Sequence, residues 1–104
     1  MGMGTPINGM HKSHLVGGGA VVSGIVAFTT TGATVEVNCG GFTKISGASA
    51  LALGTPASDE VLSFNETATA GEFMDVPTSG TITLTRTGAS KTSGLKVSVV
   101  LFGF

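Results

Sequence analysis

The chain has 104 residues, which is the size of one domain with a single hydrophobic core. Charged residues make up only 11% of it, against about 25% in a typical globular domain, and the formal net charge is −1. The few basic residues are scattered and form no stripe, which argues against a nucleic-acid-binding surface. A hydrophobic fraction of 41% with little net charge argues against disorder, so we expect a compact β protein with Gly-rich turns.

So little charge leaves a monomer poorly protected against self-association, and we expect association to be part of the function. The single cysteine, Cys39, allows no intrachain disulfide. Residues 15–28 are apolar, but glycines interrupt them and they are shorter than the roughly 20 residues of a membrane span, so we expect no membrane insertion. The start of the sequence lacks a basic segment followed by an apolar run, so we expect no signal peptide.

The first residues show no hydrophobic periodicity, and their glycines and Pro6 disfavour a regular element. We predict that residues 1–19 form a flexible arm that ends in the glycine hinge 17–19, and that residues 20–104 form a single β domain. We expect the arm to contact a partner molecule. The residues expected to make this contact are Pro6, Ile7, His11 and His14.

Residues 20–29 predict the first strand of the domain. Val21, Ile25 and Phe28 do not fall on one alternating face, so we expect a bend at Ser23-Gly24.

Residues 33–39 alternate cleanly, which places Val35, Val37 and Cys39 on the inward face of a strand. Two glycines follow and lead into residues 42–46. We expect these two segments to form a β-hairpin.

The middle of the chain gives weaker signals. Residues 47–54 are rich in Ala and Leu and predict a strand or an irregular segment, and residues 55–60 predict a loop or a single helical turn. Residues 61–65 predict a strand. Residues 72–77 predict another, which ends at Pro77.

In residues 81–87 threonines alternate with Ile82, Leu84 and Arg86, which is the cleanest strand pattern in the chain. Arg86 falls on the inward parity. It either extends to solvent from the end of the strand or forms an ion pair across a subunit boundary.

The last residues, 94–104, begin as an alternating strand and then become apolar on both faces. A strand that is apolar on both faces must be covered on both faces, and in a short chain a neighbouring molecule is the expected cover. We place Leu95 to Val99 in the domain core and predict an oligomer or lattice interface beyond them. The interface residues are Val100, Phe102, Phe104 and Arg86.

About seven or eight short strands, with turn signals every 8–12 residues or so, predict an all-β fold. The expected architecture is a small antiparallel β-sandwich or jelly-roll-like barrel with an extended N-terminal arm.

No group of residues gives a catalytic signature. His11 and His14 have a spacing that suits metal ligands on a helix, but in a Gly-rich segment a solvated linker is favoured. Cys39 is expected to be a small buried hydrophobe. The acidic pairs Asp59-Glu60 and Glu72/Asp75 are interpreted as loop and edge charges rather than as a glycosidase or calcium site. We therefore assign no catalytic residue, no metal ligand and no cofactor.

A short chain rich in Gly, Thr and Ala, with an arm, a β body and no catalytic residues, resembles the small accessory proteins of tailed-phage virions. These are capsid decoration (cement) proteins and short fibre domains. The C-terminal residues 101–104 also resemble the end of trimeric jelly-roll domains of the tumour-necrosis-factor and C1q type. The resemblance to virion proteins implies a homo-oligomer, with a trimer favoured, that is made in the host cytoplasm and sits on the major capsid protein or other virion proteins.

We therefore expect a non-enzymatic structural protein of a virus particle, with a capsid decoration protein as the specific hypothesis. The alternative is a receptor- or glycan-binding β-sandwich module of a tail fibre or adhesin. The absence of Trp and Tyr, which offer stacking surfaces to sugars, counts against that alternative. An enzyme is disfavoured because both histidines fall in the arm.

Overall fold

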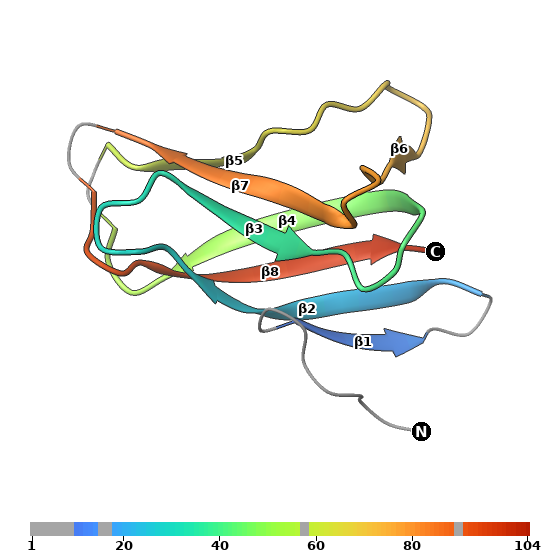
Figure 1. Ribbon diagram of the computed structural model, residues 1–104, viewed down its shortest axis with the longest axis horizontal. Helices are drawn as coiled ribbons and strands as arrows, with labels where there is room; N and C mark the ends of the chain where they lie inside the picture. Colours follow the sequence, from blue (N-terminus) through green and yellow to red (C-terminus); the bar gives the residue numbers. More distant parts are fainter. Residues whose placement is uncertain (1–9, 15–17, 57–58, 89–90) are drawn as a thin grey trace.

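The computed structural model describes residues 10–14, 18–56, 59–88 and 91–104, and the regular elements of these residues are all β-strands (Figure 1). The all-β class predicted from the sequence is therefore confirmed. The described part of the chain has no helix with the length and hydropathy of a membrane crossing. The strands are β1 Met10–His14, β2 Ala20–Ala27, β3 Thr34–Asn38, β4 Lys44–Leu53, β5 Val61–Phe64, β6 Met74–Asp75, β7 Thr81–Thr87 and β8 Lys96–Gly103.

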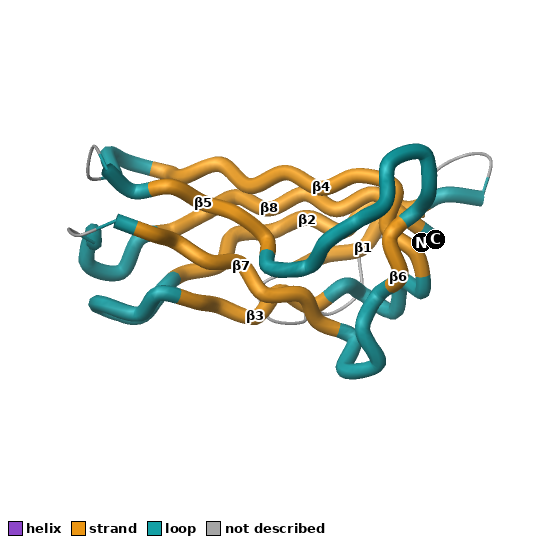
Figure 2. The backbone as a smooth tube through the Cα atoms, turned by 90° about the horizontal axis from the view of Figure 1, so that it is seen from above, coloured by secondary structure: helices purple, strands orange, loops and turns teal. Residues whose placement is uncertain are grey.

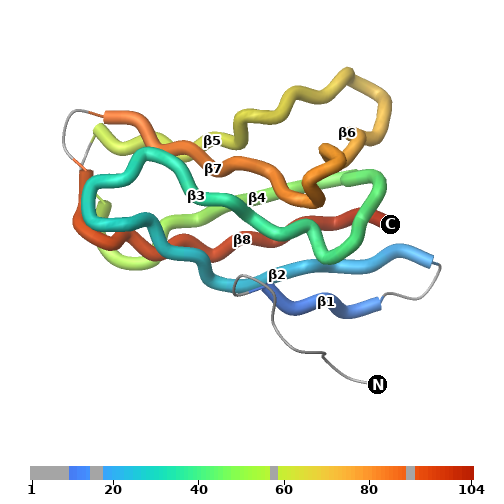
Figure 3. Tube along the Cα trace, in the orientation of Figure 1, coloured from blue at the N-terminus to red at the C-terminus, as the bar shows by residue number. Residues whose placement is uncertain are grey.

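Two antiparallel sheets make up the body (Figure 2). The larger sheet has the order β1-β2-β8-β4-β6, and the smaller one has the order β3-β7-β5. From β2 to β8, each strand lies in the sheet opposite to the strand before it, which can be followed along the colours of Figure 3. The C-terminal strand β8 is central, because it pairs with β2 on one side and with β4 on the other.

The hydrophobic core lies between the two sheets and follows the alternation of their strands. From β8 it takes Val97, Val99 and Leu101, all with 0% exposure, and β7 contributes Ile82 and Leu84. Burying one such aliphatic side chain stabilises the fold by about 1.5–3 kcal/mol. The prediction that the first half of the last strand packs in the core is confirmed.

The bend predicted at Ser23-Gly24 does not interrupt the pairing of strand β2. Its register with β8 runs without interruption from Ala20 to Ala27, so there is no bulge at Ser23-Gly24. The inward residues are Val22, Val26 and Phe28, while Ile25 points outward. Gly24 holds the inward position between Val22 and Val26. It pairs with Met10 of β1, whose buried side chain joins the core there.

The predicted hairpin over residues 33–46 is wrong, although both of its strands exist. β3 pairs with β7, and β4 pairs with β8 and β6, so the two strands lie in different sheets. Gly40 and Gly41, with φ of 64° and 84°, carry the chain across the end of the core instead of closing a hairpin. A side chain at Gly40 would meet Val22, because a Cβ there would lie 2.6 Å from Val22 Cγ2.

The flexible arm is wrong for residues 10–14, which form β1 and pair with residues 20–24. Two of its side chains hold this strand against the body. Met10 is buried with 3% exposure, and Lys12 Nζ donates to the carbonyl oxygen of Gly40 at 2.9 Å and lies 5.1 Å from the centre of the Phe42 ring. The rest of the predicted arm, including Pro6 and Ile7, lies outside the described residues, as does part of the predicted glycine hinge.

Candidate interaction surface

The outward face of the larger sheet, which we call the outer sheet face, brings together residues of four strands. The register aligns them in rows across β2, β8 and β4. The rows are Val21–Phe102–Gly47, Ser23–Val100–Ser49, Ile25–Ser98–Leu51 and Ala27–Lys96–Leu53. At the β1 side, His11 and Ser13 extend the first two rows next to Ser23 and Val21. Among these positions Lys96 is the one lysine, arginine or carboxylate.

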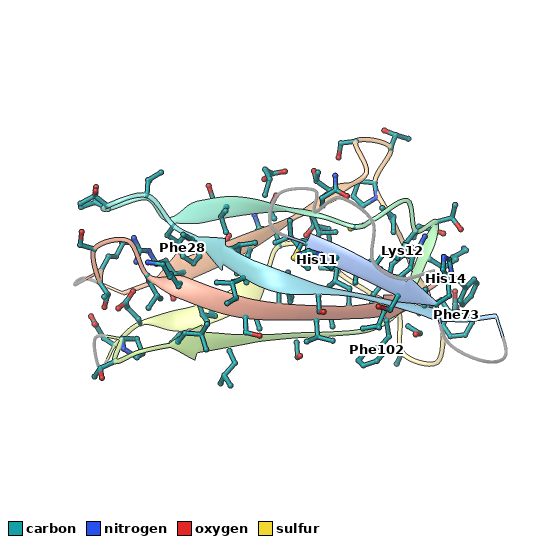
Figure 4. All side chains as sticks on the ribbon, turned by 90° about the horizontal axis from the view of Figure 1, so that it is seen from below. His11, Lys12, His14, Phe28, Phe73 and Phe102 are labelled. Atoms are coloured by element: carbon teal, nitrogen blue, oxygen red, sulfur yellow. The ribbon has the colours of Figure 1, made fainter. Side chains whose placement is uncertain are left out.

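Several large apolar side chains of the outer sheet face are open to solvent. Ile25 is 55% exposed, Leu51 70%, Leu53 40% and Phe102 46%. Figure 4 looks onto this side of the molecule and shows Phe102 on it. Single exposed apolar residues are common on protein surfaces, but a contiguous set on one face indicates an interaction site.

Phe104 extends this surface at the end of the sheet where the chain terminates. Its ring packs edge-on against Phe73 with 5.0 Å between ring centres, and both side chains are about half exposed. The backbone of Phe104 is fixed by hydrogen bonds with Lys44 in both directions, each 3.1 Å long. Phe104 is therefore held in place by the sheet although its ring is open to solvent.

The structure places the predicted interface residues in two groups. Val100, Phe102 and Phe104 do lie at the surface, where their role as an interface stays a prediction. Arg86 does not belong there, because it is only 1% exposed and its ion pair is with Glu60 of the same chain, at 3.3 Å. Both alternatives considered for Arg86, extension to solvent and an ion pair between subunits, are wrong.

The guanidinium of Arg86 instead joins loops at one end of the core. Its Nε donates to the carbonyl oxygen of Gly32 at 2.7 Å, and one terminal nitrogen donates to that of Thr29 at 3.0 Å. Its central carbon lies 4.6 Å from the centre of the Phe28 ring. The partner carboxylate of Glu60 also accepts the backbone N–H of Thr92 at 3.1 Å. The inward parity of Arg86 was readable from the sequence, but Glu60 as its partner was not.

Polar side chains on the outward face of the smaller sheet form hydrogen bonds with one another. The hydroxyls of Thr81 and Thr83 donate to the two carboxylate oxygens of Glu36, at 2.9 and 2.8 Å. The hydroxyl of Thr85 donates to Asn65. This face is therefore mostly polar, although Val61 of β5 is 60% exposed.

A small cavity of about 210 Å³ opens between the sheets on the β4–β5 side. Ile45, Phe64, Met74 and Ile82 give it apolar walls, and Glu66 and Glu72 add carboxylates. Glu66 is already engaged, since it accepts the backbone N–H of Thr83 at 3.0 Å. The cavity is smaller than the roughly 300–1,000 Å³ that small-molecule sites usually need.

The described His, Cys, Asp and Glu side chains are not grouped at one place in the structure. Among them, no three His, Cys, Asp or Glu side chains are grouped as metal ligands. His11 and His14 are three residues apart on a strand, so they lie on opposite faces of β1. Asp75 forms an exposed ion pair with Lys44.

Cys39 is fully buried, as the sequence predicted. Burial, followed by the negative charge of Glu66, raises the pKa of its thiol from 9.0 to about 11. The thiol is therefore protonated at neutral pH, and a protonated thiol is a poor nucleophile.

Comparison with known protein families, curated proteins and solved structures found no match. The interpretation of the outer sheet face therefore rests on the structure alone. Sequence reasoning missed Ile25, Leu51 and Leu53 as members of it. A usable signal was the absence of charge from residue 45 to residue 58, which includes most of β4.

Proposed function

We propose that this chain is a non-enzymatic structural protein that enters a larger assembly through its outer sheet face. The carrying observation is the set of aligned rows with exposed Ile25, Leu51, Leu53 and Phe102 and with Lys96 as the one formal charge. Core regions of protein interfaces are depleted of charge and enriched in large apolar side chains, as this face is.

The dimensions of the face support a role as the centre of an interface. Along the strands, the four rows span about 20 Å at about 3.4 Å per residue. Across the sheet, the adjacent strands β1, β2, β8 and β4 span about 14 Å at about 4.8 Å between strands, so the face covers an area of about 20 by 14 Å. That is roughly a third of the 800 Å² that each partner contributes to a standard interface. The surrounding residues, Phe73 and Phe104 among them, would supply the rest.

The more specific proposal is a capsid decoration protein of a virus particle, located in the virion and forming a symmetric oligomer, with a trimer favoured. Its partners would be copies of itself and the major capsid protein or other virion proteins, without nucleic acid or membrane. The alternation of consecutive strands between two sheets supports a jelly roll, an architecture used by viral capsid domains. The low charge and the absence of a catalytic constellation among the described residues also support a structural role.

A receptor- or glycan-binding module is the competing function, since lectin domains also use jelly rolls. Such a site needs free polar groups on loops. Three described acids are engaged instead: Glu60 with Arg86, Glu66 with the Thr83 backbone, and Asp75 of β6 with Lys44. These contacts favour the structural proposal.

Measuring the mass of the purified chain by light scattering tests the proposal directly. We expect an oligomer, and we expect Ile25→Lys or Phe102→Lys to reduce its mass, because a lysine on the outer sheet face would have to be desolvated in the contact. Thr34→Lys is the matched control, since Thr34 is an exposed β-branched residue on the outward face of the smaller sheet.

The control variant should keep the mass of the unsubstituted protein. A chain that is monomeric over its whole soluble range and binds no capsid lattice would contradict the proposal. An equal loss of mass in Thr34→Lys would assign the contact to another surface.

A further inference from the structure

Strand β4 forms a long edge of the larger sheet that is open over most of its length. Its residues from Gly47 to Leu53 pair with β8 on one side. On the other side, β6 pairs only with Lys44 and Ile45. Among the described residues, no strand or loop backbone forms a hydrogen bond with the free side of Gly47–Leu53. Alternate residues of an edge strand direct their N–H and C=O groups away from the sheet, so this segment offers an unused row of donors and acceptors.

The free edge lacks the features that usually keep sheet edges apart. Natural edges carry lysines, prolines or inward charges, or they are very short. β1 carries Lys12, β3 carries Glu36, and β5 has only four residues. Gly47–Leu53 consists of Gly, Ala, Ser and Leu alone, and Ala48, Ser49, Leu51 and Leu53 are exposed.

We propose that Gly47–Leu53 pairs antiparallel with the same segment of a second copy of this chain, around a twofold axis at Ala50. This is the register in which every residue of the free edge finds a partner. A shift in either direction leaves residues unpaired at both ends of the contact or pairs them with residues outside the free edge.

The side chains of the segment complement each other in this register. On the outward side, Leu53 lies opposite Gly47 of the second copy, and Leu51 lies opposite its Ser49. Each large side chain therefore meets a small one. A Cβ at Gly47 would be in ordinary contact with the Phe102 ring at 3.7 Å, so Leu53 of the second copy would pack beside that ring. On the inward side the alanines 48, 50 and 52 meet only alanines, so two backbones can approach to the usual strand spacing.

The paired copies would form one continuous sheet and bring their two outer sheet faces side by side. This inference does not depend on what the outer sheet face binds. A twofold contact cannot close a trimer, so in a trimeric assembly the β4 edge would connect one trimer to the next.

Single cysteine variants at Ala48, Ala50 and Ala52 test both the pairing and its register. In the proposed contact, residue 50 lies opposite itself with its Cα atoms about 5 Å apart, which a disulfide can span, whereas residue 48 lies about 14 Å from its own copy. Under mild oxidation we expect the covalent dimer of Ala50→Cys to form roughly tenfold faster than that of Ala48→Cys or Ala52→Cys. A mixture of Ala48→Cys and Ala52→Cys should cross-link efficiently, because these two residues lie opposite each other.

The unsubstituted protein is the control for Cys39, which is buried and should not cross-link. Equal rates at all three positions, or no dimer with Ala50→Cys, would overturn the proposal. A second measurement uses the protein without substitutions: exchange of the amides in Gly47–Leu53 should slow as the concentration rises, while those of β3 should not. Concentration-independent exchange would also count against the pairing.

The cross-link also separates this inference from the proposed function. In the background of Ile25→Lys, a substitution on β2 that is separated from the β4 edge by β8, the contact through the outer sheet face should be lost while the Ala50→Cys cross-link persists. If the cross-link fails and the larger assembly survives, the edge pairing is wrong and the proposed function stands.

Discussion

The two sheets follow the same alternation but present opposite chemistry to the outside. The smaller sheet presents threonines whose hydroxyls bind Glu36 and Asn65. The larger sheet presents Ile25, Leu51, Leu53 and Phe102 with almost no charge. β-branched and aromatic side chains suit a strand equally well, so secondary structure does not require this difference. Under the proposed function, the smaller sheet stays in water and the larger one is covered by another molecule.

The smaller sheet has a buried ion pair, between Arg86 and Glu60, whereas the ion pair of the larger sheet, between Lys44 and Asp75, is exposed. The largest expected change in stability comes from the buried pair. Replacing Arg86 with Leu leaves the Glu60 carboxylate buried without its counter-charge and should lower the free energy of unfolding by about 3–5 kcal/mol. Replacing Lys44 with Leu at the exposed pair with Asp75 should change it by less than about 1 kcal/mol. Urea unfolding of both variants checks this, and similar losses would contradict the burial assigned to Arg86.

Gly103 and Gly47 both lie in the larger sheet but differ in the space around them. Alanine at each position therefore tests tight and loose packing within one sheet. A Cβ at Gly103 would lie 2.2 Å from the carbonyl oxygen of Lys44, so Gly103→Ala should destabilise the fold by about 2–3 kcal/mol through forced backbone movement. Gly47→Ala brings a Cβ only within 3.7 Å of the Phe102 ring and should be close to neutral. Thermal unfolding of the pair is the measurement. A tolerated Ala at position 103 would contradict the close packing of the chain end against β4.

Cys39, buried in the core, predicts a loss of stability at alkaline pH. The pKa of its thiol is raised from 9.0 to about 11 in the folded protein, so the unfolded chain releases this proton first. The stabilisation is fully present below pH 9.0 and is lost as the pH rises through about 11. The loss should reach roughly 3 kcal/mol. Unfolding free energies of the unsubstituted protein and Cys39→Ala across this range isolate the effect, and parallel curves would contradict it.

Direct disruption of the outer sheet face should have the smallest effect on folding. Changing Phe102 and Phe104 together to Ser removes two half-exposed rings and should lower the free energy of unfolding by about 2 kcal/mol. The same change should weaken association more than tenfold, because large apolar side chains at the centre of a contact carry most of its energy. Light scattering and thermal unfolding on the same samples compare the two. Unfolding before dissociation would show that the whole strand serves the core.

The sequence predicted the features that depend on local alternation. The inward faces of residues 33–39 and 81–87, and the core role of Leu95 to Val99, are as expected. The outward position of Val100, Phe102 and Phe104 also follows from parity alone. The inward position of Arg86 was predicted correctly, but the alternation of residues could not show that it forms a buried ion pair with Glu60.

The errors concern features for which local alternation is not enough. Residues 10–14 became a strand because β2 offered an edge and the core accepted Met10. The sequence assigned Ile25 to no face, because Gly24 interrupts the apolar alternation of β2 and only the pairing with β1 and β8 shows which residues face inward. The hairpin over residues 33–46 failed because glycines that can close a hairpin can equally lead a chain into the opposite sheet.

The sequence by itself determined the all-β class, the faces of residues 33–39 and 81–87, and the two-sided apolar character of the last strand, because each depends on a period of two residues. Only the tertiary structure decided which strands are neighbours, since pairing joins residues far apart in the chain. It placed β8 at the centre of the larger sheet with β2 and β4 beside it. That placement turns scattered apolar residues into one surface, and it leaves the neutral edge of β4 open.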